Sequence, residues 1–219
     1  MVWHQYDSPG SRALLARAMP FVRFVQSHKW ESLVDFGCGF GLHCGELAKG
    51  GRKITGVDLG FLSDALDAAK AGGYELVGGS WDNLPSESFD VGYSFHCLEH
   101  SRDPIGWLHA WGRAIKPGGK LFVAVPGHST RVAIGHIAMG WSPGQLMYLT
   151  ALAGWDCRDG RFWSSRGDVY GVADRPATMV LGDVTDGRWG DNPARMPCPS
   201  GSSFDGLAGL NRPSGFEES

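Results

Sequence analysis

Apolar residues along the chain follow two spacings in turn. Five short apolar runs, bounded by glycine or polar residues, are typical of strands buried inside a sheet. These runs are residues 32–36, 53–58, 74–77, 89–95 and 120–125. Around them, apolar positions recur at helical spacing over residues 8–29, 41–49, 63–71, 104–115 and 142–154. Alternating strands and helices predict an α/β fold, a doubly wound parallel sheet with helices on both faces.

The two ends of the pattern carry local features of their own. Pro20 is expected to split the first helix, because proline cannot donate the helical hydrogen bond. Residues 161–164 and 168–173 predict a terminal pair of strands, and residues 178–181 an edge strand.

The composition changes after Arg175, where proline and glycine become frequent and large aliphatic residues scarce. Such a segment cannot bury much apolar surface and is typical of poorly ordered chain. We therefore expect an N-terminal helical segment at 1–30 that covers the functional site. A core domain at 31–175 and a partly disordered extension at 176–219 would follow it.

Composition limits the classes of partner. The 219 residues are 42% hydrophobic and 20% charged, which suits one globular domain with a buried core. A net charge of -3 argues against binding to nucleic acid or to an anionic membrane surface. Five cysteines without a CxxC pair fit a reducing compartment. With no signal-peptide pattern and no long apolar stretch, we expect a cytoplasmic location.

The strongest candidate for chemistry is the glycine-rich loop after the first predicted strand, Asp35-Phe36-Gly37-Cys38-Gly39-Phe40-Gly41. Glycines let the backbone turn sharply and approach a ligand closely. The dinucleotide fingerprint G-x-G-x-x-G would need a glycine at Leu42, so a nicotinamide-dependent oxidoreductase is a weaker alternative. Asp58, at the end of the second strand, could accept both hydroxyls of a nucleoside ribose.

Two further motifs complete an ordered set. Leu98-Glu99-His100 is followed by Asp103-Pro104, and Ile115-Lys116-Pro117-Gly118-Gly119 precedes the fifth strand. With the glycine loop and Asp58, these motifs resemble the class I S-adenosylmethionine-dependent methyltransferases. The resemblance covers roughly residues 30–155. It implies a Rossmann-like sheet, mostly parallel with an antiparallel terminal strand, and methyl transfer from S-adenosylmethionine to an acceptor, with a small molecule as the leading class. A protein that binds S-adenosylmethionine without transferase activity is the other alternative.

The resemblance also implies which residues bind the cofactor. They are Asp35, Gly37, Cys38, Gly39, Asp58, Leu59, Ser80, Trp81, Asp82 and His96. The glycine loop would line the methionine part through its backbone, with Asp35 contacting the amino group directly or through water and His96 under the methionine part. Asp58 would hold the ribose, with Leu59 against the adenine. The family's G-D-A-x-x-L-P element has Ser80 in place of its acid, so Asp82 or Ser80 would contact the adenine amino group.

Catalysis of methyl transfer is mostly alignment of the acceptor, with removal of a proton where the acceptor needs it. Histidine titrates near neutral pH and is the natural base, and His100 and His136 are the catalytic candidates. Residues 96–100 also match the zinc pattern H-x-x-E-H, which needs one continuous helix. A strand ends just before this pattern and Pro104 follows it, so we expect no metal site.

Overall fold

A computed structural model describes residues 9–127, 135–138 and 140–182. The chain divides into two compact units, Met1–Leu84 with Ser214–Ser219, and Pro85–Pro213. Residues 1–8 of the predicted N-terminal segment and residues 183–219 of the predicted extension lie outside the described residues. Each unit is described by itself below.

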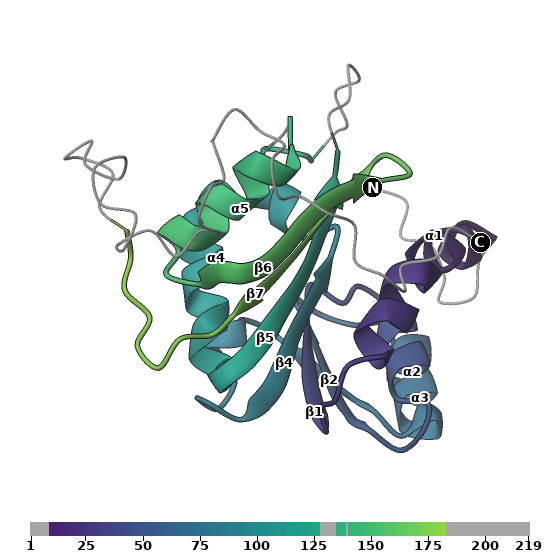
Figure 1. Cartoon of the computed structure of the whole chain (residues 1–219). Coiled ribbons are helices and arrows are strands. Elements are labelled where there is room, and N and C mark those ends of the chain that lie inside the picture. The colour runs from purple at the N-terminus through teal and green to yellow at the C-terminus, as the bar shows by residue number, and fades with distance from the viewer. Residues whose placement is uncertain (1–8, 128–134, 139, 183–219) are drawn as a thin grey trace, which may run out of the picture. The chain divides into compact units, whose positions relative to one another are not determined.

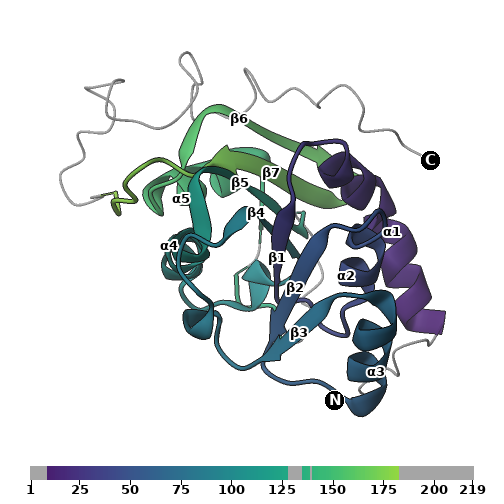
Figure 2. The same ribbon diagram turned by 90° about the horizontal axis from the view of Figure 1, so that it is seen from below.

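The first unit is a three-stranded parallel sheet with helices. Its elements are α1 (Pro9–Gln26), β1 (Ser32–Phe36), α2 (Leu42–Leu47), β2 (Lys53–Asp58), α3 (Ser63–Gly72), β3 (Glu75–Gly78) and the 3-10 turn η1 (Trp81–Asn83). The strand order is β3-β2-β1, and Asp35 of β1 lies opposite Gly56 of β2. Helices α1, α2 and α3 gather on one side of these strands (Figures 1 and 2). The carboxyl ends of the parallel strands therefore share one edge, where ligands bind in such sheets.

The expected break in the first helix at Pro20 is wrong. Helix α1 runs without interruption through Pro20, which is itself buried. The residues that follow it, Phe21, Val22, Phe24 and Val25, are also buried. The burial of this apolar face offsets the hydrogen bond that proline cannot make, which is why tertiary packing overrides the local preference.

The second unit contains a mixed sheet in the order β4-β5-β7-β6. Its elements are β4 (Phe89–Phe95), the 3-10 turn η2 (Leu98–His100), α4 (Pro104–Ala114), β5 (Ile115–Pro126), α5 (Pro143–Leu152), β6 (Asp156–Ser165) and β7 (Asp168–Asp174). Strands β4 and β5 are parallel, and β7 runs antiparallel to both β5 and β6. Arg166 and Gly167 both have positive φ, as a two-residue hairpin turn between β6 and β7 requires. The predicted terminal strand pair is confirmed.

The predicted edge strand at residues 178–181 is wrong, since these residues form no strand. The chain leaves the sheet at Arg175, whose backbone N–H donates to the Gly119 carbonyl at 2.8 Å. The Arg175 guanidinium donates to the carbonyls of Pro176 and Ala177 at 2.7 and 3.0 Å. Because these carbonyls accept from an arginine side chain, they are not paired with a neighbouring strand. Further along the segment, the Met179 side chain contacts Gly112.

Two further features of the described residues concern helix packing and membrane spans. Trp155 is fully buried and its indole N–H donates to the Leu108 carbonyl at 2.8 Å, so it joins the segment after α5 to α4. Within the described ranges, no helix is long and apolar enough to span a bilayer.

Candidate functional site

The glycine loop of the first unit is shaped by backbone conformations that suit glycine. Gly37, Gly39 and Gly41 have φ values of 73°, 56° and 75°, in the left-handed region that side chains disfavour. A Cβ at Gly41 would also lie 3.0 Å from Leu76 Cδ2, whereas a Cβ at Gly39 would meet nothing within 4 Å. The loop is therefore closely packed at Gly41, where α2 begins, and open at Gly39.

Asp58 ties this loop to the end of β2. Its Oδ2 accepts the Gly39 backbone N–H at 2.8 Å, and its Oδ1 accepts the Leu59 backbone N–H at 2.7 Å. The side chain is half-exposed, so its oxygens keep lone pairs for further donors. The fold thus brings together the glycine loop and the acid, two features that stand about 20 residues apart in the sequence.

Asp35 lies beneath the same loop in a different environment. Only 1% of the residue is exposed, and the Cys44 thiol donates to its Oδ2 at 3.4 Å. Burial raises the pKa of Asp35 to about 7, with the Cys44 hydrogen bond opposing the rise and the Asp58 charge adding to it. The carboxyl is therefore poised to change protonation near neutral pH.

The residues predicted for the adenine side follow β2 and β3. Ser80 caps the turn η1, since its hydroxyl accepts the Asp82 backbone N–H at 3.2 Å and donates to the Asp82 carboxylate at 2.8 Å. The Trp81 ring meets Phe36 edge to face, with centroids 6.4 Å apart. Leu59 is 90% exposed, so its apolar surface is free to cover a flat ring. Nine of the ten predicted cofactor residues thus lie in the first unit.

His96, the tenth, lies in the second unit and is hydrogen-bonded to Asp168 there. Its Nε2 is 2.9 Å from Asp168 Oδ1, and its ring stacks on Phe95 with centroids 4.5 Å apart. Asp168 is fully buried on β7 and also accepts from the Tyr170 hydroxyl at 3.4 Å. Asp168 was not among the predicted site residues, because it is 72 positions from His96 in the chain and no motif marks it.

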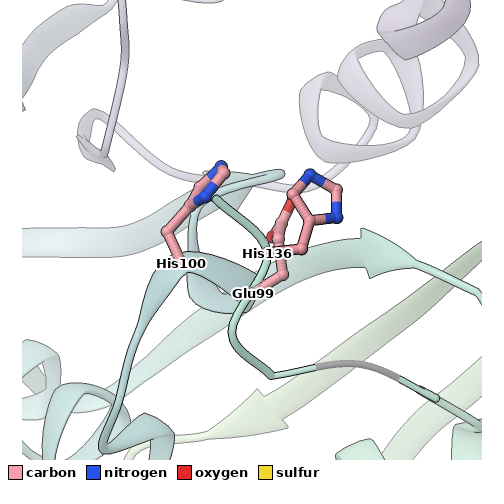
Figure 3. Close-up of side chains that lie close together, drawn as sticks. All are labelled: Glu99, His100 and His136. Atoms are coloured by element: carbon pink, nitrogen blue, oxygen red, sulfur yellow. The ribbon is translucent and has the colours of Figure 1, made fainter. Parts of the chain in front are cut away.

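The two predicted catalytic histidines come together in the second unit, as Figure 3 shows. The rings of His100 and His136 lie edge to face with centroids 5.0 Å apart. Backbone N–H groups of Ile137 and Ala138 donate to the Glu99 carbonyl at 2.8 and 2.9 Å, which fastens residues 135–138 to the turn η2.

A hydrogen bond orients the ring of His100. Its Nδ1 lies 2.8 Å from the Gly135 carbonyl, which can only accept, so Nδ1 is the donor of this bond and Nε2 is the other ring nitrogen. The pKa of His136 is lowered by burial and then by the nearby His100 and His96. The lowered pKa of His136 favours its neutral imidazole at neutral pH.

Glu99 completes this cluster and was not among the predicted site residues. It is fully buried, and neither carboxylate oxygen has a hydrogen-bond partner within the described ranges. Burial raises its pKa, against the lowering charges of His96 and His100. Glu99, His100 and His136 can place one ligand atom each within 4.8 Å of one another. A divalent cation would add positive charge beside the buried carboxylate, whose Oε1 lies 3.9 Å from His96 Nδ1.

This cluster differs from the zinc pattern H-x-x-E-H in the sequence. Leu98–His100 forms a 3-10 turn and not a helix, so His96 and His100 do not share a helix face. The third candidate ligand is His136, which follows β5. Sequence spacing could not find it, because the hydrogen bonds to η2 bring it there.

In sequence, the chain is similar to known methyltransferases. Residues 34–123 match the family model described as "Methyltransferase domain". A ubiquinone biosynthesis O-methyltransferase of Hydrogenovibrio crunogenus is 33% identical over 129 residues, covering 53% of each chain. The protein of the same name from Idiomarina loihiensis is 32% identical over 138 residues, covering 55% of this chain and 56% of that one. The chain spans about half the length of the curated relatives it matches.

Solved structures confirm the Rossmann-like fold. Burkholderia thailandensis 1,6-didemethyltoxoflavin-N1-methyltransferase, solved with S-adenosylhomocysteine, has a TM-score of 0.62 at 16% identity. The comparison covers 80% of this chain and 93% of that one. The [4+2]-cyclase SpnF also has a TM-score of 0.62, at 17% identity, with 80% and 85% covered. Fold likeness to a cyclase shows that the fold alone does not decide between reactions.

Proposed function

We propose that this protein is a class I S-adenosylmethionine-dependent methyltransferase that transfers a methyl group from S-adenosylmethionine to a small molecule, because residues 34–123 match the family model described as "Methyltransferase domain" and the relatives are O-methyltransferases. The name of the relatives favours an oxygen atom as the acceptor. The observation that carries the proposal is the bond from the Gly39 N–H to Asp58, which joins a glycine loop to a carboxylate suited to a ribose.

The first unit would bind the donor. Asp58 accepts the two ribose hydroxyls, and backbone groups of residues 37–39 line the methionine part. Asp35 meets the amino group, and exposed Leu59 covers the adenine. The Ser80 hydroxyl is hydrogen-bonded to the Asp82 carboxylate, so the adenine amino group would meet an Asp82 side chain that is already held in place. When bound, S-adenosylmethionine supplies an activated methyl group on a sulfonium.

The second unit would serve the acceptor. His136 is the leading base, because burial and neighbouring histidines keep its imidazole unprotonated at neutral pH. His100, whose Nδ1 donates to the Gly135 carbonyl, is the second candidate base and would act through Nε2. His96 is held by Asp168, and its contact with the methionine part remains a prediction.

A transfer assay tests this function. Purified protein is incubated with S-adenosylmethionine labelled in the methyl group and a panel of small hydroxylated and amine acceptors. Label in a small-molecule product supports the proposal. Binding of S-adenosylhomocysteine by calorimetry without transfer to any acceptor would favour the non-catalytic alternative. No binding of either cofactor form would refute the proposal.

Replacing His136 by glutamine is expected to lower kcat by about 100-fold or more, the usual contribution of a general base. The affinity for S-adenosylhomocysteine should not change. In the unsubstituted enzyme, kcat should be level above pH 7 and fall only as the pH drops below the ordinary histidine value of 6.5, since the pKa of His136 is lowered. The matched control is His109→Gln on α4, where the ring Nδ1 is hydrogen-bonded to the Ala153 carbonyl. Equal loss in both variants would contradict the assignment.

The same cluster is also a candidate site for a divalent cation that orients an acceptor oxygen. We expect the protein to bind Zn²⁺ or Mn²⁺ in calorimetry, and Glu99→Gln, which keeps the shape but not the charge, to weaken binding by at least about 10-fold. Treatment with a chelator separates the two chemistries. Activity that is lost and then restored by the metal supports the cation, and activity that is unaffected supports a metal-free base.

Other predictions accompany this function. An N-terminal segment that covers the site, a C-terminal extension outside the core and a cytoplasmic location are proposals that rest on composition and resemblance. Proteolysis of the full chain should release the extension first, because it has little apolar surface to bury.

A further inference from the structure

Two carboxyl groups of the first unit lie at the glycine loop in opposite environments. Asp58 is half-exposed and each of its oxygens accepts a backbone N–H, at 2.8 and 2.7 Å. Asp35 is buried and accepts a thiol, at 3.4 Å. Hydrogen bonds to the charged form favour ionisation, and burial disfavours it. Asp35 is therefore the member of the pair whose burial favours the protonated, neutral form.

Among the described residues, the surroundings of Asp35 contain no cation that would stabilise its negative charge. The sulfurs of Cys38 and Cys44 fill the space above Gly56, the residue opposite Asp35, at 2.7 and 2.8 Å from where a Cβ of residue 56 would lie. The groups that act on Asp35 are Cys44 of α2 and Asp58 of β2. A buried carboxylate needs a cation or several donors, and without them it takes up a proton.

We propose that Asp35 is protonated in much of the ligand-free protein at neutral pH and that the ammonium group of the bound cofactor displaces this proton. The inference rests on the proposed function, since it takes S-adenosylmethionine or its product as the ligand. The carboxyl loses H⁺ to the buffer, and the resulting carboxylate pairs with the ammonium. No covalent bond to the ligand forms or breaks.

This coupling makes cofactor affinity depend on pH with a defined sign. Below pH 7 the proton competes with the ligand, and above pH 7 Asp35 is ionised before the ligand arrives, because its pKa is raised to about 7. By linkage, the dissociation constant should be roughly 10-fold weaker at pH 6 than at pH 8. About half a proton should be released per ligand at pH 7, and about one at pH 6.

Calorimetry with S-adenosylhomocysteine in buffers of different ionisation enthalpy tests the proposal, because this ligand carries the ammonium but no reactive methyl group. The observed heat should vary with the buffer at pH 6 and hardly at pH 8. The second ligand is 5′-methylthioadenosine, which lacks the ammonium. It should bind without releasing the proton. Heats that are independent of buffer, with a dissociation constant that is flat from pH 6 to 8, would overturn the inference.

Three variants locate the proton. Asp35→Asn should bind without proton release, and Cys44→Ala should move the midpoint of release above pH 7, because the Cys44 hydrogen bond lowers the pKa of Asp35. The matched control is His43→Gln on α2, which replaces the residue before Cys44 in the chain, since histidine is a residue type that titrates near neutral pH. Proton release that vanishes in His43→Gln and persists in Asp35→Asn would show that the assignment to Asp35 is wrong.

A protein that binds no cofactor form at all would refute the proposed function, whereas binding without proton release refutes only this inference.

Discussion

Replacing Asp58 by alanine is expected to weaken binding of S-adenosylhomocysteine by roughly 100-fold to 10,000-fold. The variant loses two charge-assisted hydrogen bonds to the ribose, each contributing about 1.5–3 kcal/mol. It also frees the backbone N–H groups of Gly39 and Leu59, which Asp58 holds at 2.8 and 2.7 Å. The loop would then lose its tie to β2. The measurement is calorimetric titration of the purified variant.

The control for this experiment is Asp67→Ala, which removes an exposed carboxylate from α3 without touching the loop. The affinity of Asp67→Ala for S-adenosylhomocysteine should match that of the unsubstituted protein. This match would show that the lost negative charge alone does not weaken binding in Asp58→Ala. Asp58→Asn keeps one acceptor oxygen and should fall between the two. If Asp58→Ala bound S-adenosylhomocysteine as tightly as the control, the ribose assignment would be wrong and the nucleoside would have to lie elsewhere.

Asp35→Asn is expected to raise the free energy of unfolding of the ligand-free protein at pH 8 by about 4 kcal/mol. An unfolded aspartate has a pKa near 3.9, and the folded value is raised to about 7. The folded state therefore binds the extra proton between these values, and stability falls as the pH rises from about 4 to about 7. Asparagine cannot ionise, so the variant should lack this loss. Each tenfold difference between the folded and unfolded ionisation constants corresponds to about 1.4 kcal/mol.

Denaturant unfolding of both proteins at pH 5 and pH 8, without cofactor, measures this difference. The gap between the two free energies of unfolding should be small at pH 5 and widen at pH 8. Cys44→Ser serves as the comparison, because it leaves the carboxyl in place while changing the group that donates to it. A gap that does not vary with pH would mean that Asp35 is ionised in the folded protein throughout.

The predicted strands agree with the structure because a buried strand needs a nearly continuous apolar run. The runs at 32–36, 53–58 and 89–95 became β1, β2 and β4 with the same bounds. The fifth was longer than predicted, since β5 starts at Ile115 and passes through the glycine turn. There the Gly118 N–H donates to the Arg175 carbonyl at 2.8 Å. Such pairing depends on a residue far along the chain, which local spacing does not reveal.

The sequence by itself determined the α/β class, the glycine loop and the resemblance that points to S-adenosylmethionine. These features depend on short-range rules: apolar period, glycine conformation and an acid at a strand end. Only the tertiary structure decided that Asp35 is buried while Asp58 is partly exposed. It also decided that the buried carboxylate of Glu99 lies beside His136. It also paired Asp168 with His96. Burial raises the pKa of Asp35 and of Glu99, and the segments that bury them are brought together only by folding.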